Sequence, residues 1–133
     1  MKRKTSVILA ALALALSLGH ADAGTKFVGS GAVTITTQAT GAGSASGYLG
    51  HIWNSTAQTQ YIGCDYTAGP APSVMCHARS ETEQFAFCTT GSAFLAEALA
   101  AVGPDVRLSF TWNASGVCDS ITVQHSSTFA PKL

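Results

Sequence analysis

The cysteines constrain this chain more than any other feature. Three of the four follow one another at intervals of twelve residues, at Cys64, Cys76 and Cys88. The first interval contains Ala68-Gly69-Pro70-Ala71-Pro72, which cannot continue a helix or a central strand. The second contains the polar run 79–83, and apolar or aromatic residues flank both runs. The stretch 61–88 therefore predicts three short strands joined by two turns.

A turn centred on Pro70 places Cys64 directly opposite Cys76. Directly opposed residues of an antiparallel pair lie about 4.5–5.5 Å apart at their Cα atoms, within the span of a disulfide. We therefore expect a Cys64–Cys76 bridge, which leaves Cys88 for Cys118. Four cysteines allow about three connectivities in all, and the sequence leaves the other two open.

The N-terminal segment 1–23 has the pattern of a secretory signal peptide. Three basic residues precede an apolar run at 7–18, and Ala21-Asp22-Ala23 forms a small-x-small cleavage site, a combination typical of bacterial export. The run is too short to span a bilayer, which needs about 20 apolar residues. We expect a secreted or periplasmic protein whose mature chain, 24–133, forms one domain. Its cysteines are then expected in disulfides, because exported chains meet an oxidising environment.

Charge argues against two classes of partner. After removal of residues 1–23, four basic and six acidic residues remain, a formal charge of −2. Nucleic acids and anionic membranes both select for clustered Lys and Arg. We therefore expect neither as a partner, and we expect no membrane span.

Short alternating segments before the cysteines predict further strands. Val33-Thr34-Ile35-Thr36 alternates as a half-buried strand does. The Gly/Ser/Ala-rich segment 39–47 carries nothing large to bury and is expected to be a mobile loop. The segment 48–53 is expected to be the next strand, followed by a turn at 54–57.

One segment, 92–102, predicts a helix. It consists mostly of strong helix formers, Ser92 can cap its start, and Gly103-Pro104 can end it. Three- and four-residue spacing predicts one buried apolar stripe. The stripe consists of Phe94, Leu95, Ala98, Leu99 and Val102.

The segments 106–112 and 117–125 alternate as two strands of a hairpin around a turn at 113–116. This loop length places Trp112 opposite Val117, and Leu108 opposite Ile121, with both apolar sets on one face. It also places Asp119 opposite Phe110 on that face. Cys118 then lies on the other face, where its bridge ties the hairpin to a neighbouring strand or layer.

The expected fold is therefore mainly β. About seven strands and one short α-helix, at about 92–102, favour a small disulfide-stabilised β-sandwich or a partly open barrel.

The candidates for chemistry are sparse. His51, His77 and His125 could share a metal or serve a small hydrolase, but no two have a metal-binding spacing. Asp65 and Asp119 adjoin cysteines and could orient a histidine. No nucleophile motif of the G-x-S-x-G type is present. We expect no cofactor and no catalytic residues.

Aromatic residues favour binding over catalysis. Tyr48, Trp53 and Tyr66 are the candidate contact residues, because exposed aromatic rings stack on sugars and anchor protein interfaces. Loops on a stapled scaffold commonly carry function, which adds the segments 38–47, 54–58 and 67–72. We therefore expect a non-catalytic binding module for an extracellular protein, a polysaccharide or a cell surface. A histidine-based hydrolase or metal protein, and a structural envelope or matrix component, are the alternatives.

Overall fold

The computed structural model describes residues 31–126, so the expected signal peptide and the expected mature start at Gly24 lie outside it. The described chain contains seven strands and two helices. In chain order they are β1 (Thr34–Thr37), β2 (Gly43–Tyr48), α1 (Leu49–Asn54), β3 (Tyr61–Thr67), β4 (Ser73–Arg79), β5 (Phe85–Thr90), α2 (Ala93–Leu99), β6 (Val106–Trp112) and β7 (Cys118–His125).

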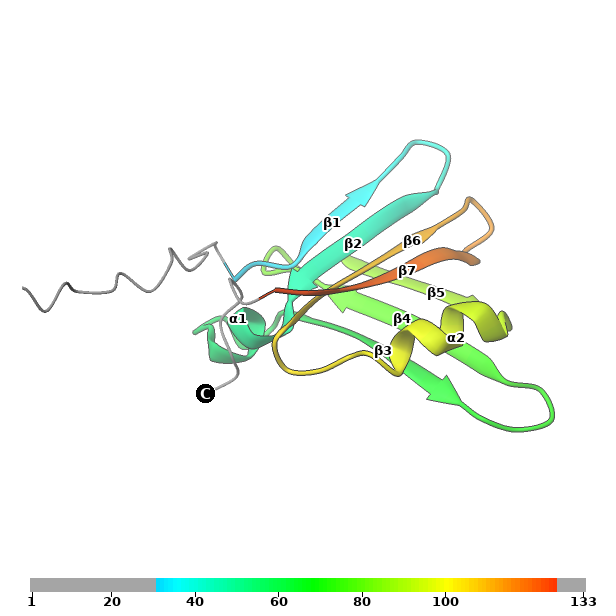
Figure 1. Ribbon diagram of the computed structural model, residues 1–133. Coiled ribbons are helices and arrows are strands. Elements are labelled where there is room, and N and C mark those ends of the chain that lie inside the picture. The colour runs from blue at the N-terminus through cyan, green and yellow to red at the C-terminus, as the bar shows by residue number, and fades with distance from the viewer. Residues whose placement is uncertain (1–30, 127–133) are drawn as a thin grey trace, which may run out of the picture.

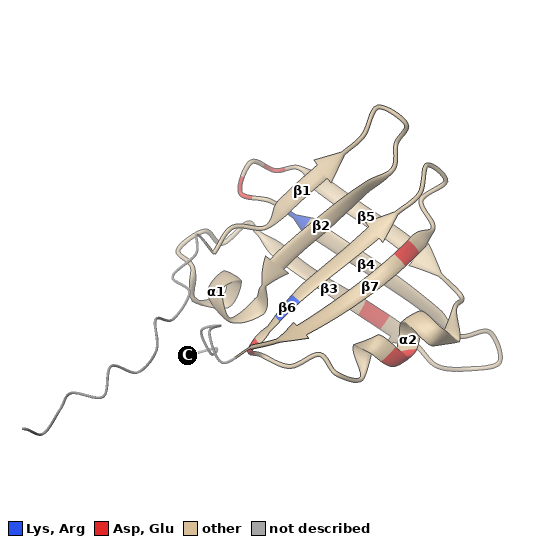
Figure 2. Cartoon of the chain, turned by 45° about the horizontal axis from the view of Figure 1, so that its top comes forward, with Lys and Arg blue, Asp and Glu red and all other residues tan. Residues whose placement is uncertain are grey.

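The strands form two antiparallel sheets that pack face to face as a sandwich (Figures 1 and 2). One sheet has the order β1-β2-β6-β7 and the other β3-β4-β5. Figure 2 shows the strands of the first sheet crossing those of the second at a steep angle. The expectation of a mainly β, disulfide-stabilised sandwich is confirmed. Neither helix that the structure describes has the length and apolar character needed to cross a membrane.

The three-stranded sheet confirms the interpretation of the cysteine spacing. Cys64 pairs directly with Cys76 across β3 and β4, and the two form a disulfide with Cα atoms 4.0 Å apart. Cys88 pairs across β4 and β5 with Cys76, but it is bridged to Cys118 in β7. The second bridge therefore joins the two sheets. The sulfurs of Cys76, Cys88 and Cys118 lie within 4.8 Å of one another, so both bridges meet in the core.

The expected mobile loop at 39–47 is wrong in its second half, because residues 43–48 form β2. The inner face of β2 carries only small residues, and each lies opposite a large residue of β6. The pairs are Gly43 with Trp112, Ala45 with Phe110, and Gly47 with Leu108. The Trp112 indole also donates to the Gly41 carbonyl at 2.9 Å. Small side chains are therefore required here, because the large side chains of β6 fill the space above them.

The expected strand at 48–53 is also wrong, because most of it forms the short helix α1. Tyr48 ends β2, and the chain must then leave the four-stranded sheet to begin β3 in the other sheet. One helical turn achieves this while Leu49 and Ile52 pack against the core and Gly50 is buried. In this segment tertiary packing therefore overrides the β-strand pattern of the sequence.

The expected helix is confirmed but is shorter, at Ala93–Leu99. The Ser92 side chain accepts a bond from the Leu95 N–H at 3.4 Å, as a capping residue does. Leu95 and Leu99 pack against the core, whereas Phe94 is 80% exposed and Val102 is 38% exposed. The predicted buried stripe therefore includes two residues that are exposed, Phe94 and Val102. Only one side of this short helix packs against the sandwich.

The β6–β7 hairpin differs in register from the expectation. Trp112 pairs with Cys118 in place of Val117, so the loop is one residue longer than expected. A bulge between Thr111 and Trp112 adds a further shift, so Phe110 lies opposite Ile121 and Leu108 opposite Val123. Cys118 lies opposite Trp112 on the inner face and is 3% exposed. The prediction that Cys118 faces away from the apolar set is wrong, but its bridge to the neighbouring layer is confirmed. Asp119 is no longer opposite Phe110 and is exposed.

Substitution of Gly43 by valine tests the pairing of small with large residues. A Cβ at this position would overlap the Thr36 carbonyl and the Trp112 ring. We expect a loss of about 1–3 kcal/mol in the free energy of unfolding, measured by urea denaturation. Ser44→Val on the exposed outer face is the matched control and should change it by no more than about 0.5 kcal/mol. Equal losses for the two variants would contradict this account of β2.

Reduction tests the two bridges. By the chain-entropy estimate, the loops of 12 and 30 residues contribute about 3 and about 4 kcal/mol. At about 4 °C per kcal/mol for a domain of this size, reduction should lower Tm by at least about 15 °C. The measurement is a calorimetric melt of oxidised and reduced protein, with thiol counting as the control. Reduced protein that melts within a few degrees of the oxidised form would show that the bridges do not stabilise the sandwich.

Candidate functional site

The outer face of the three-stranded sheet carries an exposed patch of large apolar side chains. We call it the apolar face, and it consists of Tyr61, Met75, His77, Phe85 and Phe87. Tyr61 and Met75 are 40% and 45% exposed, and Phe85 and Phe87 are 57% and 55% exposed. The five side chains line one shallow depression of about 440 Å³. A contiguous exposed apolar patch marks an interaction surface far more often than a scattered one does.

The four-stranded sheet provides the comparison within the same molecule. Its outer face carries two rows of hydroxyl side chains, one residue of each row from every strand. They are Thr34, Thr36, Ser44, Ser46, Ser109, Thr111, Ser120 and Thr122. Thr111 and Ser120 share a hydrogen bond of 2.8 Å. This is the composition expected of a sheet face in water, so the apolar face of the other sheet is not a general property of the fold.

The rings on the apolar face are tilted with respect to one another. Phe85 and Phe87 have ring centres 6.0 Å apart and planes 31° apart, and Tyr61 meets His77 edge-on at 5.6 Å and 71°. Two polar pairs lie among the rings, His77 with Asp65 at 3.5 Å and Arg79 with Glu83 at 3.2 Å. On the central strand β4, Arg79 lies between Tyr61 and Phe85, and His77 lies beside Phe87. The face is thus uneven, with rings on β3 and β5 and, on the central strand, polar side chains that already have partners.

A groove of about 680 Å³ lies at the α1 end of the sandwich. Trp53 and Tyr61 contribute aromatic rings, the loop 102–104 closes another side, and none of the lining residues is charged. The Gln60 amide spans its inner wall, since it donates to the Ser55 hydroxyl and accepts from the Val33 N–H, both at 2.9 Å. Tyr61 lines both the groove and the apolar face, so the two surfaces adjoin.

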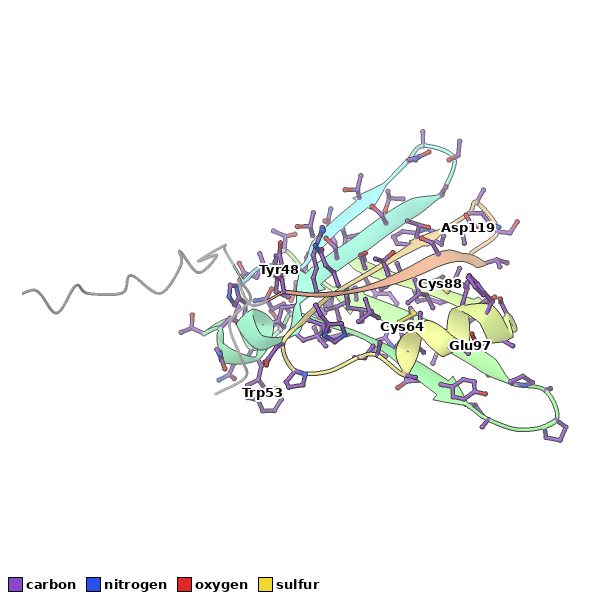
Figure 3. The ribbon with its side chains drawn as sticks, viewed as in Figure 1. Tyr48, Trp53, Cys64, Cys88, Glu97 and Asp119 are labelled. Carbon is purple, nitrogen blue, oxygen red and sulfur yellow. A yellow bond between two sulfur atoms is a disulfide. The ribbon has the colours of Figure 1, made fainter. Side chains whose placement is uncertain are left out.

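The three predicted contact residues lie on different surfaces. Tyr48 is half-buried at the end of β2, with the Arg107 guanidinium 5.6 Å from its ring centre. Trp53 is 63% exposed on α1, and Tyr66 is 51% exposed on β3, facing α2. Figure 3 shows Tyr48 and Trp53 near α1, at the opposite end of the molecule from Asp119. The predicted loops are divided as well: the turns after β1 and β3 lie at one end, and residues 54–58 beside α1 at the other (Figure 1).

The histidines are equally separate. His51 lies on α1, His77 on β4 and His125 at the end of β7. Asp65 lies 3.5 Å from His77, whereas Asp119 lies 3.5 Å from the Asn113 amide. Within residues 31–126 one group of possible metal ligands converges, and its sulfurs belong to the two disulfides described above.

Phe85, Phe87 and Met75 were not among the predicted surface residues, although the cysteine positions indicate their orientation. Successive side chains of a strand point to opposite faces. Cys88 must point inward to reach the other sheet, so Phe85 and Phe87 must point outward. The same alternation places Cys76 inward and Met75 outward.

No protein-family model, curated protein or solved structure matches this chain. The site must therefore be interpreted from its own chemistry. The apolar face can bury area against a partner, and His77 with Asp65 can add polar contacts within it.

Dye binding tests whether the apolar face is accessible in solution. The fluorescent dye ANS binds exposed apolar surface, so the folded protein should bind it. The double variant Phe85→Ser/Phe87→Ser should lose at least about half of the fluorescence, with a stability change within about 1 kcal/mol. Phe94→Ser removes an 80% exposed phenylalanine from α2 and is the matched control. Equal losses from both variants would place the accessible surface elsewhere.

Proposed function

We propose that this protein is an extracytoplasmic, non-catalytic binding domain that holds a protein partner on its apolar face. The observation that carries the proposal is the contrast between the two outer faces, one covered by hydroxyls and the other by aromatic rings and methionine. The two disulfides support an oxidising compartment, in agreement with the signal peptide that the sequence predicts.

The size of the face supports a macromolecular partner. Each aromatic side chain has about 150–250 Å² of surface, so the exposed fractions of Tyr61, Met75, Phe85 and Phe87 leave on the order of 400 Å² of apolar area. A stable protein interface buries about 800 Å² per partner, with an apolar centre and a polar rim. The apolar face can supply about half of that area, and the polar pairs among its rings can supply part of the polar contacts.

The ring geometry favours a protein over a polysaccharide. A sugar chain stacks on rings that present their faces in one plane, whereas planes 31° and 71° apart do not form such a platform. A protein surface adapts to uneven rings, because its own side chains can pack between them. Phenylalanine, methionine and tyrosine are also the residue types that protein interfaces enrich.

Partner capture with matched variants tests the proposal. The exported, oxidised protein is used to capture partners from envelope and culture-fluid fractions of its source cells. We expect a stoichiometric protein partner, with retention reduced at least about tenfold by Phe85→Ser/Phe87→Ser, because anchoring aromatic residues cost at least about 2 kcal/mol when truncated. Phe94→Ser should retain the partner fully.

Digestion of the fractions before capture separates the classes of partner. Protease treatment should abolish capture, and polysaccharide-degrading enzymes should leave it unchanged. Retention of the partner by the double variant would place the binding surface outside the apolar face. Capture that survives protease but not glycan digestion would assign a polysaccharide in place of a protein.

A further inference from the structure

The outer edge of β5 has backbone groups directed away from its own sheet. The Thr89 N–H donates to the Gly116 carbonyl at 3.1 Å, and Gly116 lies in the turn before β7, outside the β3-β4-β5 sheet. The N–H and C=O of alternate strand residues point to the same side. Pairing between β4 and β5 continues without a register shift, so the N–H and C=O of Phe85 and Phe87 also point away from β4.

The Cys64–Cys76 pair gives the same alternation independently. Its Cα separation of 4.0 Å is that of a non-hydrogen-bonded pair, for which about 4.5 Å is typical, rather than the 5.5 Å of a hydrogen-bonded one. Cys76 must therefore direct its backbone groups toward β5, where its partner is Cys88. The backbone N–H and C=O of Cys88 point back toward β4. Those of the neighbouring Phe87 therefore point away from β4, toward the open side of β5.

Among the described residues, 31–126, no strand pairs with this edge before Thr89. In residues 31–126, no backbone hydrogen bond outside the β4 pairing involves Phe85 or Phe87. The other sheet edges are protected: α2 packs against β3 and β7, and β1 is only four residues long. Natural edge strands avoid unwanted pairing with lysine, proline or bulges, but β5 reads FAFCTT and has none of these.

We propose that the edge of β5 pairs antiparallel with β5 of a second copy of this chain to form a two-fold dimer. Phe85 lies opposite Phe87 of the second copy, and Phe87 opposite its Phe85. Each of these pairs exchanges two N–H···O bonds, because the outward-directed residues form the hydrogen-bonded positions. The symmetry axis passes between the two Ala86 residues.

Two observations, and one consequence of the proposed register, favour a second copy over another strand. β5 has no charged residue, so pairing with its copy opposes no like charges. The register places phenylalanine beside phenylalanine on the exposed face, and aromatic cross-strand pairs stabilise a sheet. The Thr89–Gly116 bond ends the free edge one residue beyond Cys88, which matches the short span that the two-fold pairing requires.

The dimer would join two apolar faces into one surface. Edge pairing leaves the outer face of each three-stranded sheet uncovered, so the four phenylalanine rings of the pair lie together on a sheet of doubled width. The inference concerns the protein alone and does not depend on the identity of any partner. A two-fold edge contact also closes on itself, so it predicts a dimer and not a fibre.

Sedimentation equilibrium of the exported, oxidised protein over a concentration series is the first test. We expect a reversible monomer–dimer equilibrium. Phe87→Pro removes the outward N–H, which bonds to no other part of the described chain, and should raise the dissociation constant at least about tenfold. Phe87→Ala removes the same ring but keeps the N–H, and should weaken the dimer less. Phe94→Ala should leave it unchanged.

Amide hydrogen exchange in the unaltered protein locates the contact. Where about nine-tenths of the chain is dimeric, exchange at Phe85 and Phe87 should slow about tenfold relative to dilute protein, because it then proceeds from the remaining monomer. Ala86 and Cys88 bond to β4 and should exchange slowly at every concentration.

Several results would overturn the proposal. They are a monomer at all concentrations, open-ended assemblies, equal weakening by Phe87→Pro and Phe87→Ala, or no change in exchange at Phe85 and Phe87. The third result would indicate packing of one apolar face on another. All of these readouts use the protein by itself, so they are separate from the partner-capture experiment.

Discussion

The Cys88–Cys118 disulfide joins β5 to β7 and so connects the two sheets of the sandwich. It also determines the orientation of β5, because the side chain of Cys88 must enter the core. Phe85 and Phe87 are consequently exposed on the other face. The adjacent Thr89–Gly116 hydrogen bond fixes which N–H and C=O groups of the same strand point away from β4. The contacts between β5 and the β6–β7 turn thus determine which side chains of β5 are exposed and which of its backbone groups point away from β4.

Packing in the four-stranded sheet depends on a second constraint, the pairing of β2 with β6. Trp112, Phe110 and Leu108 are all large and buried, so the strand beside them can carry only Gly43, Ala45 and Gly47 on its inner face. The outer face of the same sheet has hydroxyl side chains that suit water. These hydroxyl groups hydrate the outer face of the four-stranded sheet although the chain has few charged residues. The outer face of the other sheet exposes aromatic rings instead.

The two proposals concern different groups of the same strand. Partner binding uses the side chains of Phe85 and Phe87 on the apolar face, whereas dimer formation uses their backbone groups at the edge. Side chains of a strand project above and below the sheet, and backbone groups project within it, so one strand can serve both contacts at once. A dimer would present two adjoining copies of the binding surface, which raises the apparent affinity for a partner that repeats.

The sequence by itself determined the β class, the three strands around the cysteines and the capped helix near 93–99, and it favoured the Cys64–Cys76 pairing that the structure shows. These follow from local rules: turn residues, side-chain alternation and helix capping act over a few neighbouring positions. Only the tertiary structure decided that 43–48 is a strand, that 49–54 is a helix and that a bulge shifts the β6–β7 register. It also decided that Tyr48, Trp53 and Tyr66 lie apart while Tyr61, Met75, Phe85 and Phe87 lie together. The physical reason is that these features depend on which residues of distant strands face each other, and the sequence pattern of one segment does not contain its neighbours.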